Sequence, residues 1–343
     1  MRETFDVTIV GAGLAGLQCA RLLGKQGLRV LLADRKASLD QKVHTTGIFV
    51  RRTLQDFDIP EDCLGPAVRH VSLYSPAHRV LHLKSEHAEY RIGRMARLYQ
   101  RYLHQCLLTG VHWLPSAVYL DSSAAWSGSV VRFKVGTTTN SISTRFLIGG
   151  DGAYSRVAQD LQLDLNCESI VGVEDVYEEV NLSGGPRLLC FVNPKLAPGY
   201  IAWVAYDGEE AHVGVGGYPD RFDPTSALAE FQGSIRSMVD LRSARRVQRR
   251  GGRIPVGGVL RKIANERGLL IGDAAGAVSP LTAGGLDPCM RLSTLAATIA
   301  TTYLTSGDPS VLNHYSGRLF RAKFTSRLWA RRMVTQLQSP ALA

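Results

Sequence analysis

The sequence of 343 residues lacks the features that mark several large classes of protein. It contains no uncharged apolar run of about 18 residues or more, so no transmembrane helix is expected. Its six cysteines are scattered and include no C-x-x-C pair, which argues against zinc ribbons and thioredoxin-type sites and favours a reducing, cytoplasmic location. Neither a G-x-S-x-G elbow nor a P-loop occurs, so we expect neither a hydrolase of that type nor an NTPase, and no metal site is predicted.

Acidic residues are also in short supply. Lysine and arginine total 40 against 30 aspartates and glutamates, which leaves a net charge of +10, and 32 of the 40 are arginine. Much of the surplus lies in residues 241–253 and 318–332, and the second stretch mixes arginine with leucine, phenylalanine and tryptophan. Such an amphipathic basic helix can contact an anionic membrane surface, or it can pack on the rest of the protein with its arginines outward. No base-reading fold accompanies the charge, so nucleic acid is a poor candidate partner.

What the sequence does contain, near its start, is a strand–helix–strand unit. Residues 5–10 (FDVTIV) are typical of a buried parallel strand, residues 17–26 have the apolar spacing of a helix, and residues 29–33 (RVLLA) predict a second strand. The length allows about two domains of ordinary size. The sequence therefore predicts an α/β protein whose first domain begins with a βαβ unit.

The turn inside this unit carries a G-x-G-x-x-G pattern at Gly11, Gly13 and Gly16. In this pattern the first glycine allows a tight turn, the second lets a pyrophosphate approach the backbone, and the third lets the helix and strand pack closely. Asp34, at the end of the second strand, can accept hydrogen bonds from a ribose diol. We therefore expect dinucleotide binding at this turn. The basic residues Arg35 and Lys36 that follow Asp34 either bind the 2′-phosphate of NADP or are solvated charges at the start of a loop, and the second interpretation is favoured.

Two later loops distinguish FAD from a nicotinamide dinucleotide. Residues 268–275 (GLLIGDAA) form an apolar strand that ends at Gly272 and Asp273, and residues 279–286 open a long helix. They resemble the segments by which large flavoproteins hold the ribityl chain of FAD and direct helix amides at the flavin N1/O2 edge. Residues 148–156 (IGGDGAYSR) resemble the G-A-D-G-x-x-S motif of flavin hydroxylases, whose Asp–Gly turn lies near the pyrophosphate.

The rest of the chain alternates between helical and strand patterns. The sequence predicts antiparallel hairpins at 68–83 and 200–218, and helices at 95–108, 225–239, 286–304 and 309–337. We predict an α/β fold in which a Rossmann-like FAD-binding domain of the glutathione-reductase type is interleaved with a smaller antiparallel-sheet substrate domain. The predicted boundaries are 1–67, 93–163 and 260–308 for the FAD-binding domain, 68–92 and 164–259 for the substrate domain, and 309–343 for a basic helical tail.

With these loops in this order, residues 4–304 resemble the FAD-dependent geranylgeranyl reductase family. That family belongs to the superfamily of para-hydroxybenzoate-hydroxylase-type monooxygenases and flavin halogenases. The resemblance implies non-covalent FAD, held by the glycine loops and by the stretch 44–47 (HTTG), with Arg94 at a phosphate and Val118 at the adenine. The implied cofactor-binding residues are Gly11, Gly13, Leu14, Ala15, Gly16, Asp34, Arg35, His44, Thr45, Gly47, Arg94, Val118, Asp151, Gly272, Asp273, Gly284, Gly285 and Leu286.

The family also carries a substrate motif, P-x-x-Y-x-W-x-F-P, followed by a V-G-V-G-G strand. Here residues 197–206 read APGYIAWVAY and residues 213–217 read VGVGG. The tyrosine stands one residue early relative to the tryptophan, so it is open whether both side chains lie on one face of the strand. The resemblance implies substrate-binding roles for Tyr200, Trp203, Tyr206 and Tyr218, and makes Tyr200, Trp203 and His44 candidate catalytic residues. Each aromatic side chain is equally compatible with the core of the hairpin.

The activity implied by the resemblance is reduction of C=C bonds in an isoprenoid or similar apolar small molecule, with hydride from N5 of the reduced flavin. The main alternative is a class A-type monooxygenase that hydroxylates an aromatic or polyketide-like substrate through a flavin C4a-hydroperoxide. A halogenase, an FAD-dependent isomerase and a flavin-binding protein without redox turnover also stay open. NAD(P)H or a reduced ferredoxin-type protein would supply electrons. Cys289, beyond the flavin-proximal glycines, is either a reactive thiol or a small buried residue, and the second interpretation is favoured.

Overall fold

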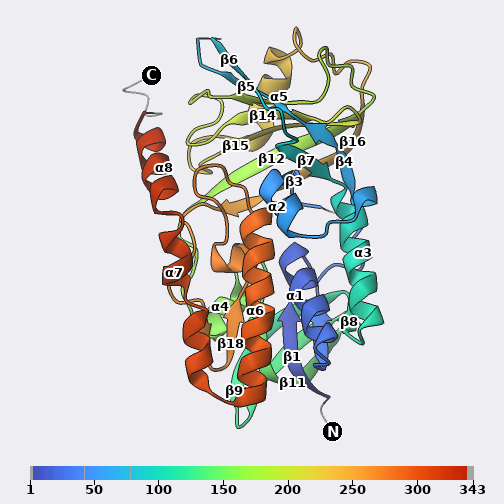
Figure 1. The fold of residues 1–343 in the computed structure, drawn as a ribbon, viewed down its shortest axis with the longest axis vertical. Coiled ribbons are helices and arrows are strands. Elements are labelled where there is room, and N and C mark those ends of the chain that lie inside the picture. The colour runs from blue at the N-terminus through green and yellow to red at the C-terminus, as the bar shows by residue number, and fades with distance from the viewer. Residues whose placement is uncertain (1–2, 42, 78, 338–343) are drawn as a thin grey trace. The chain divides into compact units, whose positions relative to one another are not determined.

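A computed structural model describes residues 3–41, 43–77 and 79–337 (Figure 1). These residues form two compact units, and the chain passes between the units repeatedly. The first unit comprises Met1–Gln41, Ala96–Glu168 and Pro255–Leu328, and the second comprises Lys42–Met95, Ser169–Ile254 and Trp329–Ala343. This division assigns residues 42–67 to the second unit, whereas the sequence analysis places them in the FAD-binding domain. The boundaries of the functional domains therefore stay a prediction.

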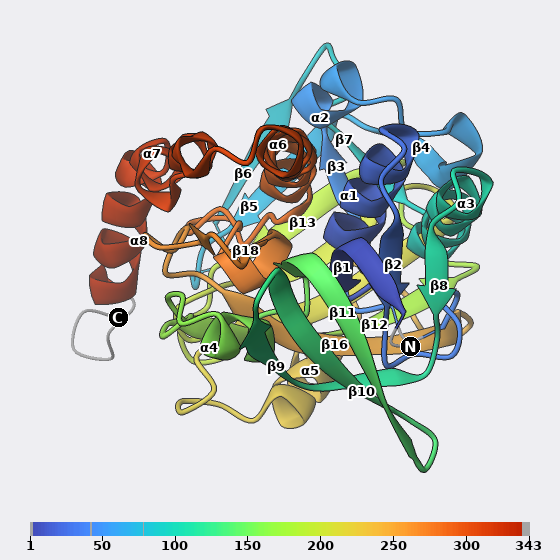
Figure 2. The same cartoon turned by 90° about the horizontal axis from the view of Figure 1, so that it is seen from below.

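The first unit is built on an 8-stranded mixed sheet. Its strands are β1 (Thr4–Val10), β2 (Val30–Ala33), β8 (His112–Leu114), β9 (Ala117–Ala125), β10 (Gly128–Val135), β11 (Thr138–Gly149), β17 (Ala264–Asn265) and β18 (Gly268–Leu270). The strands β8, β2, β1, β11 and β18 run parallel in this order. Figure 2 shows β9 and β10 as an antiparallel hairpin joined to β11. Because β2 and β18 are buried along their whole length, they read as continuous apolar runs in the sequence.

This strand order is that of a Rossmann-type sheet, and it identifies where a ligand would bind. The chain goes outward from β1 through β2 to β8 and then returns to the other side of β1 as β11. The order therefore reverses between β1 and β11, and ligands of such sheets bind beyond the carboxyl ends of the strands at this reversal. The predicted α/β class with a Rossmann-like domain is confirmed.

Helices cover the first unit's sheet. They are α1 (Leu14–Lys25), α3 (Met95–Leu108), α4 (Arg156–Asp160), α6 (Leu286–Ser306) and α7 (Gly317–Ala322), with 3-10 turns η2 (Gly272–Ala275) and η3 (Pro309–His314). Figure 1 shows α1 beside α6, and the Gln18 side chain of α1 donates to the Thr294 hydroxyl of α6 at 3.1 Å. Helix α6 ends at Gly307, which has a left-handed backbone that glycine adopts readily.

The second unit contains a 7-stranded sheet and a 3-stranded sheet. The larger sheet has the order β16 (Arg245–Pro255), β12 (Ser169–Glu178), β15 (Glu210–Gly217), β14 (Ala202–Tyr206), β13 (Arg187–Phe191), β5 (His70–Tyr74) and β6 (Val80–Lys84). The smaller has the order β3 (Ile48–Val50), β7 (Tyr90–Gly93) and β4 (Leu64–Val68). The remaining elements are α2 (Arg51–Asp56), η1 (Glu61–Cys63) and α5 (Pro224–Ser234). The two predicted hairpins form as β5–β6 and β14–β15.

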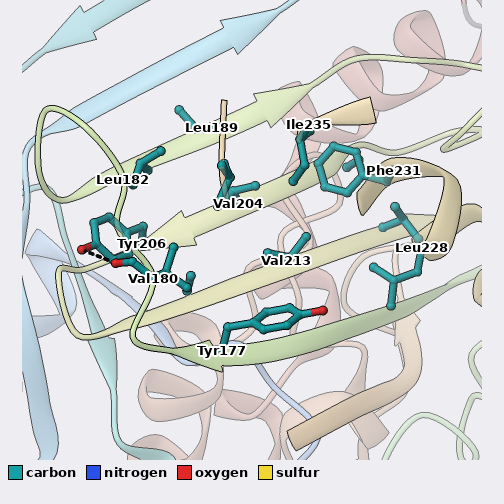
Figure 3. Close-up of a cluster of buried hydrophobic side chains, with 14 of the residues drawn as sticks. Tyr177, Val180, Leu182, Leu189, Val204, Tyr206, Val213, Leu228, Phe231 and Ile235 are labelled. Carbon is teal, nitrogen blue, oxygen red and sulfur yellow. Dashed lines mark hydrogen bonds between the residues drawn. The ribbon is translucent and has the colours of Figure 1, made fainter. Parts of the chain in front are cut away.

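One face of the 7-stranded sheet and helix α5 form the hydrophobic core of the second unit (Figure 3). Side chains at alternate positions of β14 and β15 point into it, as period-two strand geometry requires. Helix α5 contributes Leu228 and Phe231, both almost fully buried. The helix begins after Asp223, whose carboxylate accepts from the Ser226 amide at 2.7 Å, and it ends at Ser234 rather than at the predicted residue 239.

The C-terminal stretch is helical but broken. Between η3, α7 and α8 (Thr325–Leu337) the chain leaves the helix at Ser316 and again at Lys323 and Phe324. It therefore forms short pieces rather than one long amphipathic helix. Among the described residues no helix combines the length and the apolar character needed to cross a bilayer.

Candidate functional site

The three glycines of the first loop serve different structural needs. Gly11 has a φ of +102°, and a Cβ there would overlap the carbonyl oxygen of Gly150. A Cβ on Gly16 would overlap the carbonyl oxygen of Gly11. A Cβ on Gly13, in contrast, would meet no atom of the described chain within 4 Å. Packing within the protein thus explains why residues 11 and 16 are glycines, whereas Gly13 borders open space.

That open space lies at the start of α1. Gly13 is the N-cap of the helix, and within the described part of the chain no side chain caps it and no acidic residue occupies its first turn. The first amides of a helix have no partner inside the helix and carry the positive end of its dipole. Leu14 and Ala15 begin the helix, so their N–H groups belong to this set. The arrangement suits the phosphate of a nucleotide.

Asp34 is fixed beside the same loop. Its Oδ2 accepts from the Ala12 amide at 2.7 Å, and its Oδ1 accepts from the Lys36 amide at 2.8 Å. The Asp34 carbonyl also accepts from the Ala117 amide at 2.8 Å, which brings the start of β9 to this point. Val118, the next residue, is 43% exposed. The structure therefore brings together the residues predicted to contact a ribose and an adenine.

Arg35 and Asp151 were also predicted to bind FAD, but their surroundings differ from those of the glycine loop and Asp34. Arg35 is exposed. Asp151 follows β11 and lies beside the start of α4, whose N-cap is Ser155; its carboxylate accepts from the Ser155 hydroxyl at 2.6 Å and from the Arg156 amide at 2.8 Å. Burial raises the pKa of Asp151, although these hydrogen bonds favour its charged form. Any contact of either side chain with FAD stays a prediction.

The loop after β18 packs against the first loop. Gly272 has a φ of +56°, and a Cβ there would lie 2.8 Å from the Cβ of Ala15. Burial raises the pKa of the next residue, Asp273, to about 6. Asn166, which the sequence analysis did not single out, donates to the carbonyls of Asp273 at 2.8 Å and of Ala153 at 3.2 Å. Asn166 thus ties together the turns that follow β11 and β18.

The segment that leads into α6 completes this group. Gly285 is the N-cap of the helix and Leu286 its first residue. A Cβ on Gly285 would lie 3.7 Å from Asp273 Oδ1, so this helix terminus is close to the carboxylate. Gly284 donates to the Thr282 hydroxyl at 3.4 Å. Ala283 has a φ of +51°, a strained conformation of the kind often found at binding sites.

In the second unit, the stretch 44–47 is fastened mainly through backbone atoms. Nδ1 of the exposed His44 lies 3.0 Å from the Gly251 carbonyl. The Thr45 carbonyl accepts from Arg250 Nη1 at 2.8 Å. Gly47 has a φ of +86°, and its carbonyl accepts from the Gly93 amide at 2.8 Å. Residues from β7 and β16 therefore hold this short loop in place.

Arg94 carries several ion pairs within the second unit. Its Nη1 lies 2.8 Å from Asp207 Oδ2 and 3.3 Å from Glu210 Oε2, and its Nη2 lies 2.5 Å from Glu209 Oε2. Asp207 is fully buried, and Arg94 is its cationic partner. Burial alone would lower the pKa of Arg94, but these carboxylates raise it. Its predicted contact with an FAD phosphate stays a prediction.

Two of the four predicted substrate-binding aromatics share one face of the β14–β15 pair. Trp203 stands opposite Gly214, and a Cβ on that glycine would overlap the indole ring. The Tyr200 ring lies in the same way over Gly216, 6.2 Å from the Trp203 ring and edge-on to it. The glycines of the VGVGG strand thus make room for flat rings. The offset of Tyr200 in the sequence does not move it to the opposite face.

The other two aromatics lie in different surroundings. Tyr206 belongs to the hydrophobic core in Figure 3, and its hydroxyl donates to the Val180 carbonyl at 3.0 Å. The Tyr218 hydroxyl accepts from Arg331 Nη2 at 2.9 Å, and the Arg331 guanidinium also lies over the Tyr218 ring. Substrate contacts of these residues stay predictions.

A buried charged network that was not predicted from the sequence lies beneath Trp203. Glu174 on β12 accepts from the Thr46 hydroxyl at 2.6 Å and from Trp203 Nε1 at 3.3 Å. His212 on β15 lies between Glu174 and Glu210, 3.3 Å from a carboxylate oxygen of each. The available signal was the pair Glu174 and Asp175 inside the apolar strand IVGVEDVY, because a buried acid needs a partner.

The charges of this network support one another. Burial alone would raise the pKa of Glu174, but His212, Thr46 and Arg250 lower it below its usual range. Burial alone would lower the pKa of His212, but Glu174 and Glu210 raise it. The partners of each group therefore favour its charged form.

Comparisons with known proteins agree with this geometry. The FAD binding domain family matches residues 4–327. A digeranylgeranylglycerophospholipid reductase from Methanocaldococcus jannaschii is 25% identical over 329 residues, which are 93% of this chain and 83% of the relative. The crystal structure of a geranylgeranyl bacteriochlorophyll reductase-like protein from Thermoplasma acidophilum superimposes with a TM-score of 0.87 at 19% identity, covering 99% of this chain and 90% of that one.

A p-nitrophenol 4-monooxygenase from Pseudomonas putida shares the same fold. Its TM-score is 0.77 at 17% identity, and the match covers 99% of this chain and 91% of the monooxygenase. The resemblance of residues 4–304 to flavoproteins of the geranylgeranyl reductase type, predicted from the loops, is confirmed. The chain belongs to the FAD binding domain family and is an FAD-dependent oxidoreductase similar to geranylgeranyl reductases.

Proposed function

We propose that this protein reduces C=C bonds of an isoprenoid or similar long apolar substrate. The observation that carries the proposal is the aromatic face of β14–β15, where Trp203 and Tyr200 lie over glycines, in a chain whose relatives include a reductase of geranylgeranyl lipids. Flat aromatic rings offer a large apolar surface to a hydrocarbon chain. Reduced FAD, when bound, supplies the hydride equivalent for such a reduction.

In this proposal the residues of the first unit bind the cofactor by their backbone. The open space at Gly13 would accommodate the pyrophosphate and the first amides of α1 would donate to it, while Asp34 would accept hydrogen bonds from the ribose hydroxyls. Asp273 would accept a hydrogen bond from a hydroxyl of the ribityl chain, and the amides at the start of α6, from Leu286 on, would donate to the flavin ring. Donation from these amides favours negative charge on the reduced ring.

The reductase and monooxygenase interpretations differ in their products. The enzyme is loaded with FAD, reduced by dithionite without oxygen, and given a geranylgeranyl lipid. The proposal expects flavin reoxidation and a product that has gained two hydrogens per reduced bond. A protein that instead consumes NADPH and oxygen, and yields a product with one added oxygen, is a monooxygenase, as its fold also allows. Purified protein that neither carries nor takes up flavin contradicts both.

The electron donor is proposed to be NAD(P)H or a reduced ferredoxin-type protein. The two are separated by mixing oxidised enzyme with each donor under argon and following the loss of the flavin absorbance band. Bleaching by NADPH within seconds identifies a nicotinamide donor, and bleaching only by the reduced iron–sulfur protein identifies the other.

Long apolar substrates of this class reside in membranes. We therefore propose that the cytoplasmic protein contacts an anionic bilayer peripherally through helix α8. Trp329 and Met333 lie one turn apart on this helix and are 61% and 60% exposed. Arg327 and Arg332 flank them, and the Arg332 guanidinium lies over the Trp329 ring. Amphipathic basic helices of this kind bind anionic lipid surfaces.

Vesicle sedimentation tests the contact. Vesicles with anionic lipid should bind the protein more tightly than neutral vesicles do, and Trp329→Ser should weaken binding to the anionic ones. Equal binding to both vesicle types contradicts the proposal and favours the alternative that the arginines of the helix serve solubility.

A further inference from the structure

Glu174 occupies a singular position in the second unit. It is 4% exposed in the middle of β12, and its oxygens are divided between two sets of partners. Oε2 accepts from the Thr46 hydroxyl at 2.6 Å and from Trp203 Nε1 at 3.3 Å. Oε1 lies 3.3 Å from His212 Nδ1 and 3.6 Å from Arg250 Nη1. One carboxylate thus bridges the loop 44–47 to the indole of the aromatic face.

The cations on the other side of Glu174 hold the same loop. Arg250 lies against Oε1 and also donates through Nη1 to the Thr45 carbonyl at 2.8 Å. His212 is tied in turn to Glu210, which pairs with Arg94. Glu174 is therefore contacted by groups from β14, β15, β16 and the loop, and removing it would break contacts to all four.

Asp175, the next residue on β12, shows that an acid can be buried on this strand without bridging the loop 44–47 to the aromatic face. Asp175 is also fully buried, but it points to the opposite face of β12. Its carboxylate accepts from Arg249 Nε at 2.7 Å and from Gln232 Nε2 at 3.0 Å, and neither partner belongs to the loop 44–47 or to the aromatic face. The two acids lie on the same strand at a similar depth and each pairs with its own arginine, Glu174 with Arg250 and Asp175 with Arg249, but they differ in what they connect.

We propose that Glu174 is a positioning residue that holds the loop 44–47 and the indole of Trp203 in a fixed relation to each other. The role of this pair in catalysis rests on the proposed function, in which Trp203 contacts the substrate, and on the prediction from the sequence that the loop contacts the flavin. A carboxylate that accepts from both groups through one oxygen allows neither to move without the other. Reactions that depend on orientation lose rate steeply when such groups are displaced.

Amide hydrogen exchange of the FAD-loaded protein tests the positioning directly. Thr46→Val should speed exchange across residues 43–50 by roughly five-fold, which corresponds to the loss of one hydrogen bond. Glu174→Ala should speed it at least as much, because it also removes the partner of Arg250, which holds the Thr45 carbonyl. The double variant should exceed Glu174→Ala only slightly, because the contact that Thr46→Val removes is already lost in Glu174→Ala. Asp175→Asn is the matched control and should leave exchange in this segment unchanged.

Activity supplies a second readout. The kcat of Glu174→Ala for the C=C reduction should fall roughly ten-fold with FAD still bound. Glu174→Gln keeps an oxygen for Thr46 and Trp203, so it should recover part of that loss.

Three results would overturn the proposal. They are unchanged exchange at 43–50 in Glu174→Ala, an equal increase in Asp175→Asn, and full additivity of the double variant. If Glu174→Ala does not fold, Thr46→Val decides alone, and normal exchange in that variant contradicts the proposal. Because exchange needs no substrate, the positioning role is decided even if the wild-type protein forms no reduced lipid.

Discussion

The two units prepare their candidate sites in different ways. In the first unit, the site consists of backbone: glycines that allow close approach, helix amides and carbonyls, with few side chains such as Asp34 and Asn166. In the second, it consists of side chains: the chain of charges from Arg94 through His212 to Glu174. A backbone site depends on local sequence, because adjacent residues form it. A side-chain network depends on residues that come together only through sheet register.

Glycine substitution should give the largest effect and separates packing from ligand binding in the first unit. Gly16→Ala places a Cβ on the Gly11 carbonyl oxygen, so we expect a loss of about 4 kcal/mol or more in the free energy of unfolding. Gly13→Ala meets no described atom within 4 Å, so it should cost about 1 kcal/mol and yet weaken FAD binding strongly. Urea denaturation and flavin fluorescence titration measure the two quantities. Equal stability losses in both variants would contradict the distinction.

Removal of the Arg94 side chain tests whether the second unit depends on its ion pairs. Arg94→Met leaves the fully buried Asp207 without its arginine, so unfolding should become easier by about 3 kcal/mol. The measurement is urea denaturation of the protein without FAD. If stability is unchanged and only FAD affinity falls, Arg94 serves a phosphate rather than the network.

The pH dependence of stability sharpens the comparison, because titration affects the network more than a backbone site. The pKa of His212 is raised above its ordinary 6.5 by Glu174 and Glu210, against the opposing effects of burial and Arg250. Its stabilisation is therefore complete below pH 6.5 and is lost as pH rises through the raised value. The pKa of Glu174 is lowered from 4.5, so its stabilisation is present above pH 4.5 and is lost as pH falls through the lowered value.

Comparison of His212→Gln with the wild type measures this. The variant should be less stable by about 2 kcal/mol near pH 6, and the difference should shrink as the pH rises through the raised pKa of His212, because the wild-type imidazole then becomes neutral. Denaturation at a series of pH values provides the data. A difference that grows with pH would show that His212 is neutral in the folded protein.

Cys289 should give the smallest effect. It is buried, and burial raises the pKa of its thiol, so the reactive thiolate is disfavoured. Cys289→Ala should cost about 1 kcal/mol of stability and leave the flavin spectrum unchanged. A thiol reagent should modify the exposed Cys167 first in the native protein. Early modification of Cys289 would instead support a redox role.

The sequence predicted the fold and the first unit's loops because their signals are local. Gly11, Gly13 and Asp34 occur within one strand–helix–strand unit, and the spacing of apolar residues marked its elements. Residues 42–67 carry no pattern that shows which sheet they join; they lie in the second compact unit, and the predicted boundaries of the functional domains stay a prediction. The helix predicted to reach residue 239 ends at Ser234. The prediction ran too far because the apolar spacing in the sequence continues beyond the last turn of the helix.

The charged network could not be predicted, because its members lie on four separate segments. Glu174 and Asp175 on β12 point to opposite faces, and so do Arg249 and Arg250 on the adjacent β16. Each acid thus meets an arginine on its own face. Some arginines of the stretch 241–253, which holds much of the surplus positive charge in the sequence, have their partners within the second unit.

The repeated passage of the chain between units has a consequence for its synthesis. The first unit's parallel sheet needs β18, at Gly268–Leu270, and the second unit's aromatic face needs β15, at Glu210–Gly217. On the ribosome, the glycine loop at residues 11–16 therefore emerges long before the strands and helix that pack around it. Truncated chains that stop before residue 268 would leave the buried residues 147–149 at the end of β11 without their partner strand, a surface that favours aggregation or chaperone capture over folding.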